Sequence, residues 1–453
     1  MRKGSGSMGI TSEWSRNLAS IGGLSEEDRA QLRLLVVDFA AASCAGFALN
    51  RDFNAAVERT VFAQGGAEEC LVFRQARKWP ARTAAFMNAV YGHGAELDDG
   101  NKRAAGHPGV HVIPAVFALA EKLGRTDEEV LEALATGYEA YIRISAAAQP
   151  GMVRRGFHST GMAGTLACAA ACARLFGMDA AGLEDAMALA TTMSGGLLSY
   201  GDSRPAIKPL NPGKAAENGV FAAMLAAEGV KGPTEALEGR NGWFHAVTDE
   251  VHLEFLRGGE RLLLHDCYFK LYPSCRHTHC GIDAGVALHG RLGGRPIESV
   301  RIHIYPNAIR LAGLEHPQSP DETKFSIPYT LACALAKGGY GIGDMDAAAA
   351  PAAVRELSGK IAMVPDEAME DRARGLRGAR VEVRLTDGES LEETVSVPKG
   401  DPENPLTRED ILHKLEACAQ GLADGAHLAA FVQAVDALGG RESFSNPMAE
   451  LRG

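Results

Sequence analysis

Small apolar residues, mostly alanine, recur at helical spacing from about Ser12 to Glu260 of this 453-residue chain. LSEEDRAQLRLLVVDFAAASCAG illustrates the pattern, because an acidic first turn follows Ser25, apolar residues recur every three or four positions, and a glycine ends the run. PAVFALAEKLG, GTLACAAACARLFG and LEDAMALATTMSGG repeat it. Helices with small side chains can approach one another closely, so the sequence predicts a compact bundle with several nearly buried central helices.

The spacing of apolar residues changes after Asp266. SVRIHIYP, GARVEVRL and ETVSVPK alternate apolar and polar residues, which predicts three β-strands. FSIPYTLACALAKGG and PAAVRELSGKI have helical spacing, and TREDILHKLEACAQ and AHLAAFVQAVDAL return the tail to helix. We therefore expect a mainly α fold, with a large all-helical domain formed by both chain ends (residues 11–266 and 401–453) and an inserted smaller α+β domain (residues 267–400).

Charge, cysteine usage and hydropathy narrow the range of functions. The formal net charge is −11 and no basic run occurs, so we expect no nucleic-acid partner. Such a chain can bind an anionic substrate only by gathering its cations locally. The nine cysteines are scattered through apolar stretches, which is typical of a reduced, intracellular chain. We find no signal-peptide core and no run of roughly 18 apolar residues, so we expect a cytoplasmic protein with no membrane partner.

One short loop is dense in titratable residues. Its acids and histidines are Glu96, Asp98, Asp99, His107 and His111. Pro114 suits the first position of a helix, so we expect His107 and His111 to lie just before a helix N-terminus. The residues alone leave open a solvated loop, a proton donor and acceptor, or a metal site. The ligands of that metal site would be Asp98, Asp99, His107 and His111.

Three further segments place histidine or lysine beside an expected helix. GFHSTGMAGTLACAA has His158 just before a helix, with Ser159 or Thr160 as the expected N-cap. Lys208 lies in the connection IKPLNPG. HDCYFKLYPSCRHTHC, at the junction with the α+β segment, supplies Lys270, Arg276, His277 and His279. CRHTHC also allows a zinc site, although its spacing is tighter than that of the usual ligand pairs. Its ligands would be Cys275, His277, His279 and Cys280.

Together these loops supply the groups needed to remove a proton beside a carboxylate. That chemistry requires a base, an acid and cations that stabilise the developing negative charge. The candidates are Asp98, Asp99, His107, His158, Lys208 and Lys270. The sequence contains no glycine-rich phosphate cradle, nucleophile elbow or dinucleotide fingerprint that would favour another chemistry.

Ordered motifs cover nearly the whole chain. They are GAELDDG, HPGVHVIPAVFALAE, GFHSTGMAGTLACAA, IKPLNPGKAAENGVFAAMLAAEGVKGP, KLYPSCRHTHCGIDAGVAL and KFSIPYTLACAL. In this order they resemble the MmgE/PrpD family, which includes 2-methylcitrate dehydratase, cis-aconitate decarboxylase and iminodisuccinate epimerase. The resemblance implies a mainly helical domain made of both termini, a smaller α+β lid, and a homodimer.

The resemblance also implies chemistry on a small polycarboxylate, between the two domains, without a metal or organic cofactor. Mapped by motif, the site comprises Asp98 or Asp99, His107, His158, Lys208, Lys270 and Tyr329. We expect Arg276 and His277, beside the junction, to bind substrate with Tyr329. Two departures concern the substrate: Glu96 stands where many relatives carry aspartate, and SCRHTH differs from the methylcitrate dehydratases.

We therefore expect a lyase that dehydrates or decarboxylates a small di- or tricarboxylate. An epimerase or isomerase that uses the same proton abstraction is the first alternative. A catalytically silent helical binding protein is the second. The residue types do not separate the two kinds of enzyme, because each needs a base, an acid and a group of cations for the carboxylates.

Overall fold

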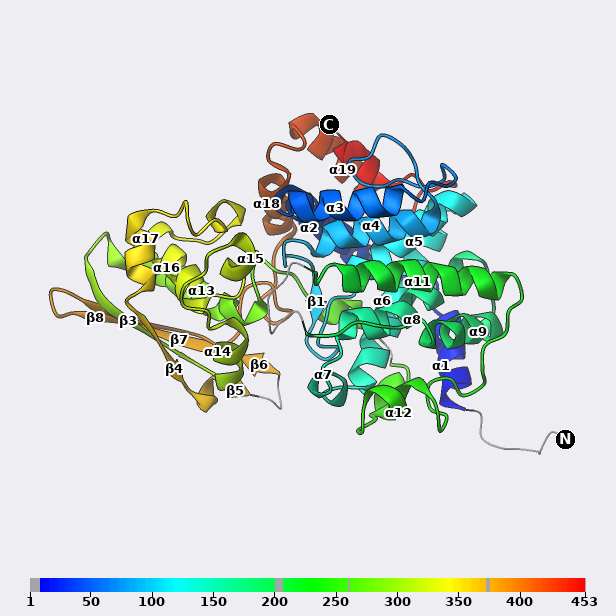
Figure 1. Ribbon diagram of the computed structural model, residues 1–453, viewed down its shortest axis with the longest axis horizontal. Coiled ribbons are helices and arrows are strands. Elements are labelled where there is room, and N and C mark those ends of the chain that lie inside the picture. Colours follow the sequence, from blue (N-terminus) through cyan, green and yellow to red (C-terminus); the bar gives the residue numbers. More distant parts are fainter. Residues whose placement is uncertain (1–8, 200–206, 260, 372–374, 453) are drawn as a thin grey trace.

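Two separate hydrophobic cores organise the chain, which is mainly helical (Figure 1). The computed structural model describes residues 9–199, 207–259, 261–371 and 375–452. The larger core is all-helical and includes both chain ends, whereas the smaller core surrounds a four-stranded sheet. We refer to these as the helical part and the sheet part.

The helical part contains thirteen α-helices among the described residues, and α2 begins at its predicted signal, directly after Ser25. They are α1 (Ile10–Ala19), α2 (Glu26–Leu49), α3 (Arg51–Phe62), α4 (Ala81–His93), α5 (Gly109–Leu123), α6 (Asp127–Ala147), α7 (Gly151–Arg154), α8 (Ser159–Leu175), α9 (Ala180–Thr191), α11 (Leu210–Ala227), α12 (Trp243–Val247), α18 (Arg408–Ala419) and α19 (Gly425–Asp436). Ser25 and Asp28 form a capping box that starts α2. A cap of this kind stabilises a helix by about 1 kcal/mol.

Small side chains let the central helices pack closely, as the alanine-rich stretches predicted. Helix α8 is buried along almost its whole length and packs against α6 and α11. At Gly219 of α11, an added Cβ would lie 2.2 Å from the Cβ of Cys168. Only glycine fits such an approach, so the α8–α11 contact depends on the absence of a side chain there.

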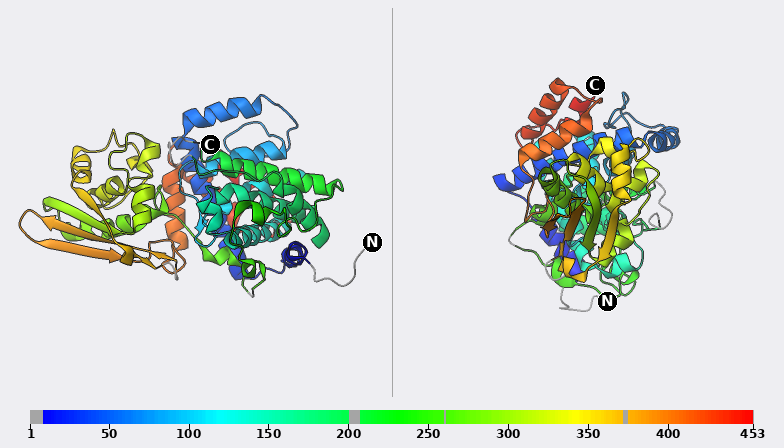
Figure 2. Two further views of the ribbon diagram at one scale, coloured as in Figure 1. Left: turned by 60° about the horizontal axis from the view of Figure 1, so that its bottom comes forward. Right: turned by 90° about the vertical axis from the view of Figure 1, so that its left-hand side faces the viewer.

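Helix α2 is long and apolar enough, by length and mean hydropathy alone, to cross a membrane. Its apolar part is interrupted by Asp38, so it contains no unbroken apolar run of that length. In addition, 72% of its apolar window is buried inside the fold, where α2 packs against α4 and against α18 of the tail. It therefore has the environment of a core helix. The packing of α18 and α19 on α2 also explains why both ends of the chain share one core (Figure 2).

The sheet part has the strand order β4-β3-β7-β8, with β3 and β4 parallel and the other pairs antiparallel. Its strands and helices are α13 (His279–Leu292), β3 (Ile297–Ile304), α14 (Pro306–Ala312), α15 (Pro320–Thr323), α16 (Ile327–Lys337), α17 (Ala352–Ser358), β4 (Ile361–Pro365), β5 (Glu370–Asp371), β6 (Leu376–Arg377), β7 (Ala379–Leu385) and β8 (Ser390–Val395). Helices α13 and α16 pack together against this sheet.

The period-two stretches correspond to β3, β7 and β8, although β8 overlaps only the first three residues of the predicted segment ETVSVPK and begins at Ser390. Strand β4 was missed, because it is a short edge strand whose burial does not alternate and which forms by parallel pairing to β3. Short 3-10 helices complete the chain. They are η1 (Leu253–Leu256), η2 (Leu263–Asp266), η3 (Arg276–Thr278), η4 (Ile342–Asp344), η5 (Glu367–Met369) and η6 (Pro447–Leu451).

A two-stranded ladder ties the titratable loop to the start of the sheet part. Strand β1 (Gly100–Asn101) pairs antiparallel with β2 (Cys267–Tyr268). The residues that follow β2, including Lys270, are thereby held beside the loop between α4 and α5. This ladder brings together candidate residues that are about 170 positions apart in sequence.

Candidate active site

A cavity of about 1040 Å³ lies where the helical part meets the sheet part. Its helical wall consists of His93, Glu96, His107, His158 and Lys208. Its sheet-side wall consists of Arg276, His277, Arg310, Lys324 and Arg377. Lys270, after β2, also lines the cavity. The structure thus gathers most of the sequence-predicted site residues around one hollow.

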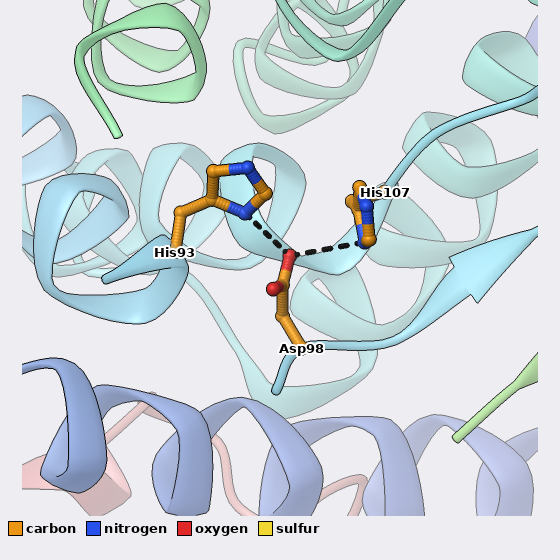
Figure 3. A group of neighbouring side chains, drawn as sticks. All are labelled: His93, Asp98 and His107. Atoms are coloured by element: carbon orange, nitrogen blue, oxygen red, sulfur yellow. Dashed lines mark hydrogen bonds and ion pairs between the residues drawn. The ribbon is translucent and has the colours of Figure 1, made fainter. Parts of the chain in front are cut away.

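Asp98 lies beneath this hollow and holds two imidazoles (Figure 3). Its Oδ2 is 2.8 Å from Nδ1 of His93 and 3.3 Å from Nδ1 of His107, and its side chain is almost fully buried. Burial opposes ionisation of Asp98, but His93 and His107 outweigh it, and the pKa of this carboxyl lies well below its usual range. Asp98 is therefore a fixed negative charge that orients both rings.

The ring of His107 has its proton on Nδ1. This atom lies 2.6 Å from the backbone carbonyl of Asp99, and a carbonyl oxygen can only accept a hydrogen bond. Burial lowers the pKa of His107 to about 3, so the ring is neutral near pH 7 and its Nε2 has a free lone pair. Because His107 lines the cavity, its imidazole can serve as a base there.

Asp99 lies behind the loop and does not line the cavity. Its Oδ1 accepts a hydrogen bond from the backbone N–H of Gly109 at 3.0 Å, which helps to start α5. The helix therefore begins at Gly109, and the expectation that Pro114 would occupy its first position is wrong. Burial, followed by the charges of Asp38 and Asp98, raises the pKa of Asp99 well above its usual range. These features suit a structural role.

Neutral His158 carries its proton on Nε2, whereas His107 carries its proton on Nδ1. The amide nitrogen of Asn211 donates to its Nδ1 at 3.0 Å and also faces the carbonyl of Leu197 at 3.4 Å, which supports this amide orientation. Burial, followed by the charge of Lys208, lowers the pKa of His158 well below its usual range. The neutral ring accepts at Nδ1 and therefore donates from Nε2.

The N-cap expected for α8 was wrong. His158 itself precedes the helix, and the hydroxyls of Ser159 and Thr160 are used elsewhere. Ser159 donates to the carbonyl of Ala105 at 2.6 Å, and Thr160 accepts from the backbone N–H of His107 at 3.3 Å. Both hydroxyls fix the loop that carries His107, so the start of α8 positions the two histidines relative to each other.

Glu96 bridges the two predicted lysines. Lys208 makes a short ion pair with its Oε1, while Nζ of Lys270 is 3.4 Å from its Oε2 and 2.9 Å from its backbone carbonyl. Burial opposes ionisation, but the two lysines outweigh it, and the pKa of Glu96 lies well below its usual range. These groups form a cluster of two cations and one anion, in which Glu96 and Lys270 are buried and Lys208 is partly exposed.

The sheet-side wall presents Arg276 and His277. The guanidinium of Arg276 lies 4.8 Å from the ring centre of Tyr268, and its Nη2 is 2.5 Å from Oδ1 of Asp401. His277 shares a hydrogen bond with the hydroxyl of Tyr305, and burial lowers its pKa to about 3. Both residues line the cavity, where Arg276 offers a positive charge.

Tyr329 is not brought to this cavity. Its side chain is buried, and its hydroxyl donates to the backbone carbonyl of Asp344 at 2.6 Å. Lys324, from the same KFSIPY motif, does line the cavity. Its Nζ reaches the carbonyl of Gly94 at 2.9 Å and Oδ1 of Asp321 at 2.6 Å. Lys324 therefore connects the sheet part directly to the loop that begins the helical wall.

The CRHTHC segment does not form the zinc site that its sequence allowed. His279 contacts Arg276 and the carbonyl of Ser274, and the thiol of Cys280 donates to the carbonyl of Arg377 at 3.0 Å. His277 has its own partner in Tyr305. All nine cysteines are free thiols. The four donors of this segment do not converge anywhere in the part of the chain that the structure describes.

Within the described ranges, one group of metal-ligating side chains does converge: His93, Asp98 and His107. It differs from the set of Asp98, Asp99, His107 and His111 suggested by the sequence. His111 instead faces Cys168 of α8, with its Nδ1 3.4 Å from the sulfur. Nδ1 of His107 donates to a carbonyl, and Oδ2 of Asp98 lies 2.8 Å from Nδ1 of His93, so these side chains are already joined by hydrogen bonds.

Comparison with known families identifies the chain. A model of the MmgE/PrpD N-terminal domain matches residues 14–256, and a model of the MmgE/PrpD C-terminal domain matches residues 272–438. The chain belongs to the MmgE/PrpD family. The helical wall lies within the N-terminal match and the sheet-side wall within the C-terminal match, while Lys270 falls between the two matched regions.

Several curated MmgE/PrpD-type relatives are similar over most of the chain. Cis-aconitate decarboxylase of Aspergillus terreus is 27% identical over 92% of this chain and 90% of its own length. Human cis-aconitate decarboxylase is 27% identical over 75% and 73%, and the cis-aconitate decarboxylase-like protein oryM of Aspergillus oryzae is 27% identical over 79% and 80%. These similarities support a lyase of the MmgE/PrpD family.

Sequence reasoning missed three residues of this MmgE/PrpD site. His93 is the last residue of the apolar helix α4, where a lone histidine gives no signal beyond that of a core residue. Asn211 follows Lys208 within IKPLNPG, and Lys324 begins the KFSIPY motif. Each of the three lies in or directly beside one of the family motifs. Closeness in sequence to the chosen candidates was therefore the signal that could have indicated them.

Proposed function

We propose that this protein is a lyase that dehydrates or decarboxylates a small di- or tricarboxylate in the cavity between its two parts. The reaction proceeds by proton transfer next to a carboxylate. It requires no metal or organic cofactor, because the residues of the chain supply the base, the acid and the stabilising cations.

The observation that carries this proposal is the excess of cations in the cavity. Among the described residues that line it, eight are cationic and three are acidic. The cations are Lys102, Arg154, Lys208, Lys270, Arg276, Arg310, Lys324 and Arg377. The acids are Glu96, Asp321 and Asp401. In a chain with a net charge of −11, such a concentration of positive charge favours a substrate with several negative charges.

Two neutral histidines offer complementary proton positions in this cavity. His107 has its proton on Nδ1 and a lone pair on Nε2, so it can remove a proton. His158 accepts from Asn211 at Nδ1, so its Nε2 can donate one. Dehydration needs a proton removed beside a carboxylate and a proton given to the leaving hydroxyl. Decarboxylation needs only a proton given to the carbon that loses carbon dioxide.

Lys208 and Lys270 stabilise the negative charge that develops on the substrate. Lys270 is 1% exposed, so its charge acts in surroundings that contain little water. Electrostatic interactions are stronger in such surroundings than in bulk solvent. We also propose that the sheet part closes as a lid over bound substrate, because Arg276 and Lys324 would then reach it from the side opposite His107.

An epimerase or isomerase of a dicarboxylate is the second candidate. The same pair of imidazoles favours it, since one base and one acid can remove and return a proton on opposite faces of a carbon. The ring of His93 lies 5.0 Å from that of His107 and 6.0 Å from that of His158, measured between ring centres. Both rings therefore lie close to the same residue of the cavity wall, so both are near enough to serve one substrate carbon.

The test is a product survey by NMR in deuterated water with cis-aconitate, 2-methylcitrate, citrate and iminodisuccinate. A lyase converts at least one compound, and a decarboxylated product carries solvent deuterium at the carbon that lost carbon dioxide. Deuterium exchange or epimerisation without elimination would favour the second candidate. Binding without turnover or exchange of any compound would contradict both and favour a silent binding protein. We also propose that the protein is a cytoplasmic homodimer. Light scattering tests the oligomeric state, and cell fractionation tests the location.

A further inference from the structure

Three buried lysines from distant segments of the chain each donate to a backbone carbonyl of the loop between α4 and α5. They are Lys270, Lys324 and Lys414, which bind the carbonyls of Glu96, Gly94 and Leu97 at 2.9, 2.9 and 2.7 Å respectively. Each lysine is at most 5% exposed. The first two line the cavity, whereas Lys414, in the tail helix α18, does not. The tail therefore contacts the helical wall from outside the cavity.

Lys414 also forms a buried ion pair with Asp38 of α2. Its Nζ lies 2.5 Å from Oδ1 of Asp38, a side chain with no exposed surface. Burial raises the pKa of Asp38 to about 6 against the opposing charge of Lys414, so this carboxyl is mostly ionised near pH 7. A capping box formed by Thr407 and Asp410 starts α18, which packs against α2 (Figure 1). Two helices of the helical part thus hold the ammonium in place.

The peptide group that Lys414 holds lies between two carboxylates of the site. The carbonyl of Leu97 directly precedes Asp98, which orients two imidazoles. Glu96, on the other side of Leu97, contacts two lysines of the cavity. Glu96 also has a φ of +55°, in the left-handed region, and such strain persists where the surrounding structure imposes it. A displacement of Leu97 would therefore move both carboxylates.

A buried ion pair such as that of Asp38 and Lys414 is a weak source of stability. Removing both charges from water costs about as much as their attraction returns, and an apolar pair of similar volume is often equally stable. The bond from Lys414 to Leu97 differs, because it gives a buried carbonyl its partner and fixes the direction in which the chain enters Asp98. The loop therefore explains the buried ammonium better than the packing of α18 does.

We propose that Lys414 is a positioning residue, which fixes the peptide between Leu97 and Asp98 from outside the cavity and so places the carboxylates of Glu96 and Asp98 for proton transfer. This inference rests on the proposed function. Lys414 does not touch the substrate, so its loss should slow the chemical step more than it weakens binding. A misplacement of about 1 Å caused by a distant change can lower a rate by about 10²-fold.

The test compares three variants with wild type. Lys414→Met removes the ammonium and leaves Asp38 without it. The double variant, Asp38→Leu with Lys414→Met, replaces the pair by apolar side chains, so that no charge of the pair remains but Leu97 still lacks its donor. Arg143→Met is the matched control. Arg143 is 6% exposed, pairs with buried Glu139 and donates to two backbone carbonyls, yet it does not line the cavity.

Melting temperature, kcat and KM are measured for each protein, the last two on a surveyed compound that wild type converts. Lys414→Met and the double variant should both lose about tenfold or more in kcat, while KM stays within about threefold of wild type. The double variant should melt above Lys414→Met, because it has no unpaired buried charge. Arg143→Met should melt below wild type but keep kcat within about threefold. The double variant decides the question if Lys414→Met does not fold.

Three results would overturn the inference and leave the proposed function untouched. They are a wild-type kcat in Lys414→Met, recovery of kcat together with stability in the double variant, and a loss of kcat in Arg143→Met as large as that in Lys414→Met. Each would mean that Lys414 only stabilises the fold. If wild type converts none of the surveyed compounds and exchanges none of their hydrogens, the proposed function fails and the inference fails with it.

Discussion

The two walls of the cavity differ in how firmly their charged groups are held. On the helical wall, His93, His107 and His158 are each less than 10% exposed and fixed by hydrogen bonds within the helical part. On the sheet-side wall, Lys324 is buried and Arg276 is mostly buried, but Arg310 and Arg377 are exposed. The comparison suggests that the histidines of the helical wall move protons and the sheet-side arginines bind carboxylates, while Lys208 and Lys270 stabilise the charge that develops during the reaction. Changes to the first should lower kcat, whereas changes to the second should raise KM.

The largest effect is expected on the helical wall. His107→Ala removes the base whose Nδ1 is fixed by the Asp99 carbonyl. We expect kcat to fall by about 10²-fold or more, the usual cost of losing a general acid or base, with little change in ligand affinity. Steady-state kinetics on a surveyed compound whose reaction begins with removal of a proton measures this. His252→Ala, at a half-exposed histidine outside the cavity lining, is the matched control and should keep full activity. Normal folding with full turnover in His107→Ala would remove the distinction between the walls.

A smaller effect is expected on the sheet-side wall. Arg276→Gln removes a cation that faces the cavity beside Tyr268. KM should rise by about tenfold and its dependence on salt should weaken, while kcat stays within about threefold of wild type. Arg291→Gln, at an exposed arginine of the same part that pairs with Glu393, is the control. If Arg276→Gln lowered kcat as strongly as His107→Ala, both walls would share the chemistry.

Stability in acid should reveal a property that the walls have in common. Burial lowers the pKa of His107 and of His277 to about 3, below the roughly 6.5 expected in the unfolded chain. The unfolded state then binds more protons, so stability is present above about pH 6.5 and falls as pH decreases toward 3. Each histidine adds a slope of about 1.4 kcal/mol per pH unit in this range.

Urea unfolding of wild type and His277→Gln at several pH values measures this slope. The variant should lose stability less steeply than wild type below about pH 6.5, because one buried histidine no longer resists protonation. If the free energy of unfolding changed with pH in the same way for both proteins, His277 would titrate normally in the folded state. The sheet-side wall would then be more hydrated than its burial indicates.

The smallest effect is expected from chelation. His93, Asp98 and His107 converge as metal ligands could, but Nδ1 of His93 is hydrogen-bonded to Asp98 and Nδ1 of His107 to the backbone carbonyl of Asp99. Activity should therefore survive exhaustive dialysis against a chelator, and elemental analysis should find no stoichiometric zinc or iron. Loss of turnover that one metal per chain restores would reassign the helical wall to metal chemistry.

Local patterns were enough to predict the helical bundle, the strands β3 and β7, and the loops that carry His107, His158 and Lys208. These features depend on apolar spacing and on residue types that occur near helix ends, both visible in the sequence. The features that were missed depend on contacts that the spacing of apolar residues does not reveal. Strand β4 exists because β3 pairs with it, and α5 begins early because the carboxylate of Asp99 accepts from Gly109.

The same limit applies to single residues. His93 has no local feature that separates it from a core histidine, and its role follows only from Asp98 folding back beneath it. Tyr329 shows the opposite error. Its motif predicted that it lies in the cavity, but its hydroxyl donates to the carbonyl of Asp344 instead. A motif indicates which segment approaches a site, whereas the packing decides which side chain of that segment reaches it.

The most direct test of the division between the walls is exchange of substrate hydrogen with deuterated water at saturating substrate. Wild type, His107→Ala and Arg276→Gln are compared by NMR, using a surveyed compound whose reaction begins with removal of a proton (2-methylcitrate, citrate or iminodisuccinate). Because saturation removes differences in binding, the account predicts deuterium incorporation in Arg276→Gln within about threefold of wild type, and a loss of about 10²-fold or more in His107→Ala. Incorporation at the wild-type rate in His107→Ala would contradict it.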